Sequence, residues 1–158
     1  MRNRFFIPKP IASIFRHPPN HAAAAEGKKI EMKQLKLPKT TNHQIVEGAG
    51  GVLVPLNQKD LYAEWADKRN LTVLLVSRHY LGSINHTLLT VEALRSRGIK
   101  ILGIVFNGDE DKPTEQIILR MSELKMLGRV KNESSFNRKI ITGYAQEFRK
   151  SRRILLNT

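Results

Sequence analysis

The stretch IVEGAGGVLVPLN, residues 45–57, decides which fold this chain is expected to adopt. Two β-branched apolar residues lead into a single carboxylate, Glu47, and a glycine-rich loop separates it from a second apolar run. Glycine lets the backbone come close to a ligand, and a carboxylate where a buried strand meets such a loop suits a cation or a phosphate-bound metal. The same residues also fit a tight turn that Glu47 merely caps, because short glycine-rich loops are weak signals.

Strand-like and helix-like segments alternate along the chain. Short apolar runs, typical of buried parallel strands, occupy residues 43–47, 71–77, 100–107 and 126–130. Apolar residues at helical spacing occupy residues 58–69, 82–97, 114–124 and 140–148. Such alternation predicts an α/β fold of three layers, with a mostly parallel sheet between helices. We expect residues 71–77 to form a central strand, because they are apolar throughout, and Trp65 to belong to the core.

Length and composition narrow the class of protein. A chain of 158 residues suits a single domain over residues 1–158, with irregular segments at 1–18 and 150–158. No apolar run approaches the ~20 residues that span a bilayer, and the absence of cysteine excludes a disulfide framework. These features predict a cytoplasmic protein without membrane partners.

The chain is strongly basic, with 27 Lys and Arg against 14 Asp and Glu and a net charge of +13. Such an excess can bind nucleic acid. Here the charge is spread thinly along the chain, without the interleaved aromatic residues that stack on bases. Because of its net charge, a basic nucleic-acid-binding protein remains an alternative. The thin spread of that charge argues against nucleic acid as a partner.

Two polar positions follow apolar runs and are candidates for ligand binding. Gly82-Ser83-Ile84-Asn85 opens a predicted helix with Ser83 as its cap, and free amides at a helix start attract anions. Asn107-Gly108 ends the predicted strand 100–107, and ligands of open parallel sheets bind beyond the carboxyl ends of strands. The alternatives are an ordinary capped helix and a turn-forming Asn-Gly pair. The acids at 109–111 are expected to complement a helix dipole rather than to bind a metal.

Three segments taken together, in this order, resemble dethiobiotin synthetase, the ATP-dependent ligase before the last step of biotin synthesis. They are VEGAGGVLVPLN (46–57), YLGSINHTLLTVEAL (80–94) and GIVFNG (103–108). The resemblance extends from about Pro18 to about Phe148. It implies a P-loop NTPase-like fold and the ATP- and Mg²⁺-dependent conversion of 7,8-diaminononanoate and carbon dioxide to dethiobiotin.

The resemblance also assigns roles to residues of this chain. It implies that Glu47 binds Mg²⁺ and that Asn107, followed by Gly108, reads the adenine of ATP. Residues close to ATP and its phosphates would be Glu47, Gly48, Ala49 and Gly50. Residues that receive the substrate carboxylate of the partner subunit in a homodimer would be Gly82, Ser83, Ile84 and Asn85.

One departure from the family is large. Dethiobiotin synthetases open with a strand and a phosphate-binding loop that ends in Gly-Lys-Thr, and this tripeptide does not occur in the chain. The chain resembles the C-terminal two-thirds of the family domain, an incomplete version of the fold. We therefore expect little or no activity from it alone, and association with a complementing N-terminal piece or as a homodimer. A non-catalytic remnant that dimerises with a full-length paralogue is a further alternative.

Overall fold

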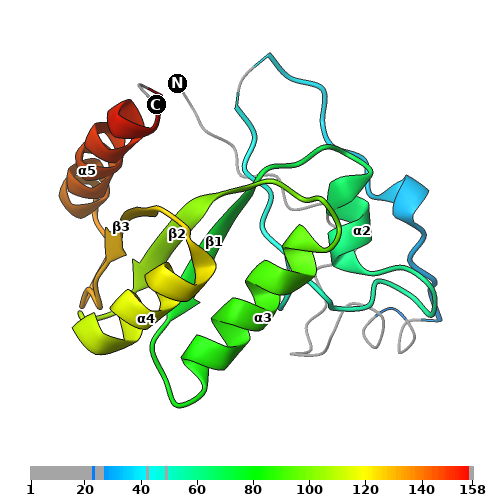
Figure 1. The fold of residues 1–158 in the computed structure, drawn as a ribbon. Helices are drawn as coiled ribbons and strands as arrows, with labels where there is room; N and C mark the ends of the chain where they lie inside the picture. The colour runs from blue at the N-terminus through cyan, green and yellow to red at the C-terminus, as the bar shows by residue number, and fades with distance from the viewer. Residues whose placement is uncertain (1–22, 24–26, 42, 49, 157–158) are drawn as a thin grey trace. The chain divides into compact units, whose positions relative to one another are not determined.

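The computed structural model describes residue 23 and residues 27–41, 43–48 and 50–156, with side chains up to residue 150. The chain divides into two compact units, residues 1–70 and 71–158 (Figure 1). The prediction of one domain over residues 1–158 stays a prediction.

The second unit is built on a parallel sheet of three strands in the order β1-β2-β3. The strands are β1 (Val73–Arg78), β2 (Ile101–Asn107) and β3 (Met126–Val130). β2 pairs in parallel with both neighbours, as the apolar run at 100–107 predicts. Parallel neighbours require a crossover connection, and helices α3 (Ser83–Arg95) and α4 (Lys112–Ser122) supply the two crossovers.

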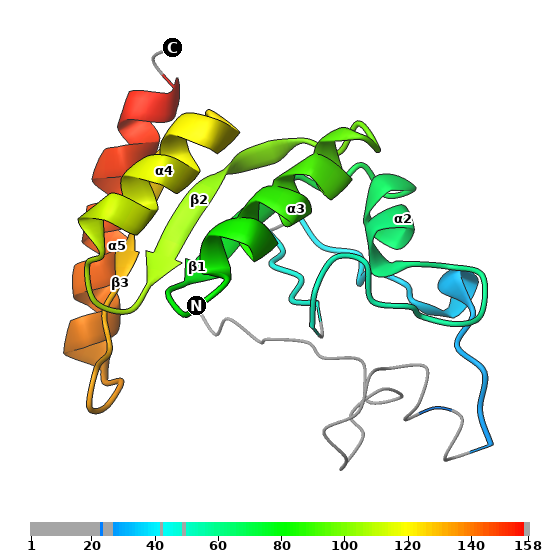
Figure 2. The same cartoon turned by 60° about the horizontal axis from the view of Figure 1, so that its bottom comes forward.

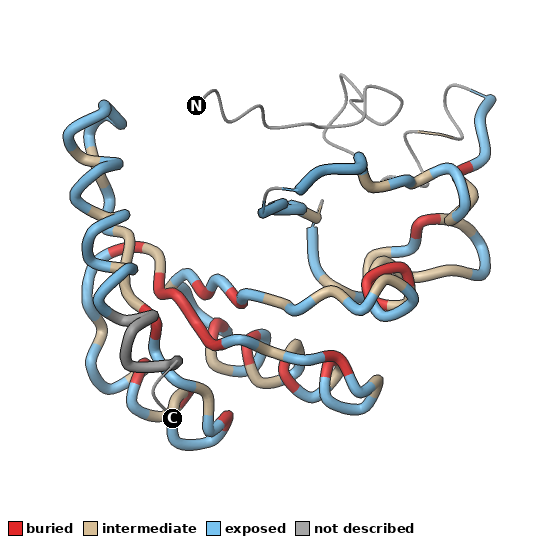
Figure 3. The backbone as a smooth tube through the Cα atoms, turned by 90° about the horizontal axis from the view of Figure 1, so that it is seen from above, coloured by how far each residue is buried: buried red, intermediate tan, exposed pale blue. Residues whose placement is uncertain are grey.

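The core of this unit lies where α3 and α4 cover one face of the sheet (Figure 2). Leu75, Ile104 and Phe106 of the sheet pack with Val91 of α3 and Ile118 of α4. Phe106 and Ile118 are fully buried. The buried positions gather along β2 and on the sides of the helices that meet it (Figure 3).

Helix α5 (Arg138–Leu156) contacts the sheet through β3. Adjacent residues of a strand point to opposite faces, so Gly128 and its register partner Val105 face away from the Phe106 side. A side chain at Gly128 would meet the ring of Phe148, which places α5 on the face opposite to α3 and α4. The three-layer α/β/α architecture with a parallel sheet is therefore confirmed. The helix runs to Leu156, beyond residue 150, where the sequence suggested an irregular tail, because no glycine or proline interrupts residues 149–156.

Two predicted strands differ in the structure. Residues 71–77 were expected to be central, yet β1 is an edge strand, with Leu74 48% and Val76 61% exposed. Residues 43–47 form no strand, and Ile45 is 87% exposed. Apolar residues alone do not form a strand, because a strand also needs a neighbouring strand for its backbone hydrogen bonds.

Helix boundaries also shift where local hydrogen bonds compete with the periodic pattern. Gly82, with a φ of 99°, is the N-cap of α3, and Ser83 is a buried first-turn residue instead of the predicted cap. α4 starts at Lys112, because the Asp111 side chain accepts a hydrogen bond from the Thr114 amide at 3.2 Å. This cap agrees with the assignment of the acids before α4 to its amino end. Met121 of α4 is 61% exposed although it is apolar.

The first unit contains the short helices η2 (Met32–Gln34) and α2 (Tyr62–Asp67). Trp65 is 4% exposed, as predicted for a core residue. Its Nε1 donates to the Leu35 carbonyl at 3.1 Å, and Arg69 donates to the same carbonyl at 2.8 Å. α2 begins later than the predicted residue 58, because Asn57 Oδ1 accepts hydrogen bonds from the amides of residues 59 and 60 in a turn.

Across the described residues, none of the helices combines the length and the apolar character that a bilayer span requires.

Candidate functional site

The carboxyl ends of the three strands bring together the candidate residues of the second unit. Arg78, Asn107 and Val130 end β1, β2 and β3, and they are register partners across the sheet. Gly82 and the first turn of α3 follow four residues after Arg78. Asn107 and the Gly82 turn therefore lie at the carboxyl ends of adjacent strands, where ligands of parallel sheets bind. We call this end of the sheet, formed by the carboxyl ends of its strands, the sheet edge.

The turn before α3 leaves the Ile84 and Asn85 amides without a helical partner, whereas the Ser83 amide donates to the Tyr80 carbonyl at 2.9 Å. Gly82 takes a positive φ of 99° and a ψ of −3°, a conformation that glycine adopts without steric cost. No side chain caps the helix start, whereas the buried Thr87 hydroxyl bonds to Ser77 of β1 at 2.9 Å. Ile84 is half-buried and Asn85 is exposed. The helix is thereby fixed to the sheet while Asn85 stays open to a ligand.

The Asn107 side chain is held by its neighbouring strand. Its Nδ2 donates to the Val130 carbonyl at a long 3.4 Å. The backbone amide of Gly108 donates to the same carbonyl at 2.8 Å. Because a carbonyl only accepts, the NH₂ group must face Val130, and Oδ1 of Asn107 remains as an acceptor.

A buried ionic network, which the sequence did not predict, lies beneath this edge. His79 Nε2 and Glu115 Oε1 are 2.8 Å apart, and Arg129 Nη2 donates to Glu115 Oε2 at 2.6 Å. The side chains of His79, Glu115 and Arg129 are 14%, 7% and 13% exposed. The His79 ring stacks on the buried Phe106 ring, with 5.4 Å between the two ring centroids. We call these three residues the His79–Glu115–Arg129 network.

Electrostatics keep the centre of the network ionised. Burial of the Glu115 carboxyl raises its pKa, but hydrogen bonds from Arg129, His79 and the Asp111 amide lower it more, so that the pKa is below its ordinary value. The bond to Glu115 raises the pKa of Arg129. A carboxylate only accepts hydrogen bonds, so the His79 ring carries its hydrogen on Nε2. Its Nδ1 is buried without a partner among the described residues.

The only hint of this network in the sequence is the spacing of Glu115. It shares a helix face with Ile118 and Ser122, three and seven positions later, and all three are buried. An acid on the apolar side of an amphipathic helix indicates a buried partner.

The glycine-rich loop belongs to the first unit and packs against α2. A Cβ at Gly48 would lie 2.7 Å from the Tyr62 ring, and one at Gly50, whose φ is +81°, would lie 2.9 Å from Val54. Ala49 lies outside the described residues. The first amides of α2 are bonded, Tyr62 to the Val54 carbonyl at 3.0 Å and the next residue to that of Val52. The loop thus comes close to an aromatic ring, and the first two amides of α2 already have backbone partners.

Glu47 is exposed beside this loop. Burial raises the pKa of Tyr62, and the nearby Glu47 charge raises it further. Among the described residues, no group of three or more His, Cys, Asp and Glu gathers into a metal site. Mg²⁺ that is shared with a nucleotide needs only one or two carboxylates, because phosphates and water complete its coordination. An exposed carboxylate such as Glu47 fits that limited role.

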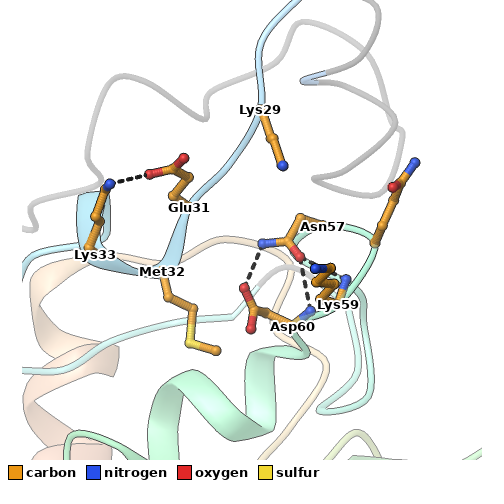
Figure 4. A pocket seen from close by; sticks show the side chains of 8 residues that line it. Lys29, Glu31, Met32, Lys33, Asn57, Lys59 and Asp60 are labelled. Carbon is orange, nitrogen blue, oxygen red and sulfur yellow. Dashed lines mark hydrogen bonds and ion pairs between the residues drawn. The ribbon is translucent and has the colours of Figure 1, made fainter.

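A pocket of about 300 Å³ opens elsewhere in the first unit (Figure 4). Asn57 Nδ2 bonds to Asp60 Oδ2 at 2.7 Å at its floor, and Glu31 pairs with Lys33 at 2.8 Å at its rim. These polar groups bind one another, and none of the predicted site residues lines the pocket.

The predicted site residues are therefore brought together in part. Asn107, Gly108 and the Gly82 turn share one sheet edge in the second unit. Glu47 and the glycine-rich loop belong to the first unit. The prediction that all of them form one site stays a prediction.

Comparison with known proteins finds similarity over most of the chain. A family model described as AAA domain matches residues 5–139. Bacterial proteins named ATP-dependent dethiobiotin synthetase are similar over most of the chain. The protein of Christiangramia forsetii is 48% identical over 132 residues, which cover 84% of this chain and 63% of the relative.

Two further relatives carry the same name. The protein of Cytophaga hutchinsonii is 46% identical over 128 residues, covering 80% of this chain and 62% of the relative. That of Rhodopseudomonas palustris is 46% identical over 112 residues, covering 71% and 54%. The chain thus spans a little over half to about five-eighths of the length of these relatives.

Proposed function

The chain belongs to the AAA domain family, whose model spans residues 5–139, and from this premise we propose that it works in dethiobiotin synthesis. The reaction is the ATP- and Mg²⁺-dependent carboxylation and ring closure of 7,8-diaminononanoate. A homodimer, carbon dioxide as co-substrate and a cytoplasmic location are parts of the same proposal. The similarity to the ATP-dependent dethiobiotin synthetases of three bacteria supports it.

One observation carries the proposal. Asn107, an amide with a free acceptor, ends the middle strand of a parallel sheet, beside a helix that starts at a positive-φ glycine. An amide can exchange hydrogen bonds with a purine edge, and helix amides attract a carboxylate. ATP presents the purine, and 7,8-diaminononanoate bound to the partner subunit presents the carboxylate, so the sheet edge matches one group of each substrate.

The reaction needs both substrates held in a fixed geometry. Carbon dioxide adds to one amine of the substrate to give a carbamate. The γ-phosphoryl group of ATP then passes to a carbamate oxygen, and ADP leaves. The second amine attacks the carbonyl carbon, loses a proton and expels phosphate as the ureido ring closes. Phosphoryl transfer relies mainly on positioning and charge stabilisation. In this proposal Asn107 orients ATP, and the turn at residues 82–85, through its Ile84 and Asn85 amides, orients the carboxylate of the partner subunit's substrate. Glu47 would hold Mg²⁺, which would neutralise phosphate charge.

The contacts to the phosphates of ATP are the part of the site that the residues named above do not supply. The chain contains no Gly-Lys-Thr or Gly-Lys-Ser, and each lost charge-assisted hydrogen bond to a phosphate is worth about 1.5–3 kcal/mol. We therefore propose that the isolated chain turns over slowly or not at all. Full activity would require a polypeptide that carries the phosphate-binding loop.

The test is an assay of dethiobiotin from 7,8-diaminononanoate, bicarbonate, Mg²⁺ and ATP. The chain is assayed alone and after co-expression with a family N-terminal piece that carries the phosphate-binding loop. Activity in the soluble complex that disappears in N107A supports the proposal. A soluble complex without product contradicts catalysis and favours the non-catalytic alternative, which mixed dimers with the full-length relative would identify.

A further inference from the structure

We propose that the His79–Glu115–Arg129 network positions Asn107 and thereby determines which purine the sheet edge accepts. The inference deepens the proposed function and rests on it for the identity of the ligand. These three residues do not touch the ligand in this proposal. They act through the strand and the loop that hold Asn107.

The network connects the elements on both sides of Asn107. His79 directly follows β1, Arg129 belongs to β3, and Asn107 ends the strand between them. Glu115 in the first turn of α4 bonds to both at 2.8 and 2.6 Å. Both contacts involve an ionised and largely buried carboxylate, and such hydrogen bonds are about twice as strong as neutral ones. The outer strands are thereby fixed to α4 at the level of Asn107.

Arg129 and Glu115 also hold the loop that leaves Asn107. Arg129 Nη1 donates to the Asp109 carbonyl at 3.4 Å, and the Asp111 amide donates to Glu115 Oε1 at 3.2 Å. These contacts fix the backbone two and four residues after Asn107. Loops are ordinarily mobile unless such contacts tie them down.

The carbonyl that orients the Asn107 amide belongs to the residue after Arg129. Val130 accepts from Asn107 Nδ2 at 3.4 Å and from the Gly108 amide at 2.8 Å. Because NH₂ faces Val130, Oδ1 is presented to the ligand as an acceptor. A 6-amino purine donates a hydrogen bond to such an oxygen, whereas a 6-oxo purine presents a second acceptor. Selectivity for ATP over GTP therefore depends on keeping Val130, and hence Arg129, in place.

The first experiment needs no nucleotide. The side-chain amide resonances of Asn107 are assigned by ¹⁵N–¹H NMR in the full chain and compared with those of E115Q and R129K. E92Q on α3 and R120K on α4 are matched controls, because Glu92 and Arg120 are exposed helix residues outside the network. R129K keeps the positive charge next to Glu115, so it remains available if E115Q does not fold.

The expected result is that R129K and E115Q shift or broaden both Asn107 NH₂ resonances while both controls leave them unchanged. Unchanged Asn107 resonances in a folded R129K protein overturn the inference. A change that also appears in the controls overturns it too, because the effect would then not depend on the network.

The second experiment measures the affinities for ATP and GTP of the same proteins. We expect R129K to lower the ATP-to-GTP preference by roughly threefold to tenfold, the range of one neutral hydrogen bond, and R120K to leave it unchanged. An unchanged preference in R129K, when N107A abolishes it, overturns the inference. Failure of the wild-type chain to bind either nucleotide contradicts the proposed function, and the amide resonances then decide separately whether the network positions Asn107.

Discussion

His79 Nε2 lies 2.8 Å from Glu115 Oε1 although the two residues are 36 positions apart in sequence. The contact joins the end of β1 to the first turn of α4. It involves a carboxylate that is ionised although it is buried, which makes the second unit sensitive to both mutation and acid.

Glu115→Gln should destabilise the second unit by about 3 kcal/mol. The substitution removes the charge that pairs with Arg129, and breaking one side of a buried ion pair leaves the other charge uncompensated. Urea unfolding measures the loss. Glu92→Gln on exposed α3 surface should change stability by less than about 0.5 kcal/mol, and equal losses in the two variants would contradict the buried-pair description.

The same carboxyl group should make stability depend on pH. The pKa of Glu115 is lower in the folded than in the unfolded protein, so its contribution is fully present above the unfolded pKa of about 4.3 and is lost as the pH falls through the folded pKa. Unfolding free energies measured from pH 6 downward should therefore fall more steeply below about pH 4.3 in the wild type than in Glu115→Gln. Parallel curves would show that Glu115 is not the group responsible.

Thr87→Val should cost about 1–3 kcal/mol, because it leaves the buried Ser77 hydroxyl without its 2.9 Å partner. The double variant Ser77→Ala/Thr87→Val removes both polar groups and should recover most of the loss. A double-mutant cycle by urea unfolding gives the coupling energy. Additive effects of the two substitutions would contradict a direct bond between them.

Gly128→Ala should destabilise the contact between β3 and α5 by about 1–3 kcal/mol, the usual range for overpacking. The added Cβ would clash with Cε1 of the Phe148 ring. Phe148→Leu should partly rescue Gly128→Ala by vacating that space. The matched control is Gly143→Ala in α5, which meets no atom within 4 Å and should stabilise by about 0.5–1 kcal/mol through helix propensity. Thermal unfolding distinguishes the two signs.

Gly82→Ala should cost about 1–3 kcal/mol, because its φ of 99° is strained for a residue with a Cβ. Gly82→Asn should cost less, since asparagine tolerates positive φ better than alanine. Urea unfolding of both variants checks the order. If alanine were as stable as wild type, the turn before α3 would not require glycine.

The sequence predicted the elements whose neighbours lie close along the chain. The segments that form β2 and α4 can be recognised from their own hydrophobic patterns, and Asp111 marks the start of α4 because it caps that helix. The edge position of β1 could not be read, because an apolar strand looks the same in the middle of a sheet and at its border. The strand predicted at residues 43–47 was wrong for a related reason, since strand formation depends on a partner.

The residues of the candidate site also divide into those that the sequence predicted and those that it did not. Asn107 was predicted because it ends an apolar run, and the Gly82 turn because glycine and serine open a helix with apolar residues at helical spacing. The His79–Glu115–Arg129 network was missed because its members are separated by 36 and 14 positions, and only folding makes them neighbours. Glu115 resembled an ordinary acid near a helix start, and its burial became evident only from the packing of α4.

The bare outer side of β1 has a practical consequence for anyone who handles this protein. Leu74 and Val76 are half to mostly uncovered on a strand whose outer backbone groups have no ladder partner in the described sheet, and such borders recruit strands from other molecules. Concentrated samples should therefore aggregate with time, and the substitution Val76→Lys should delay that aggregation.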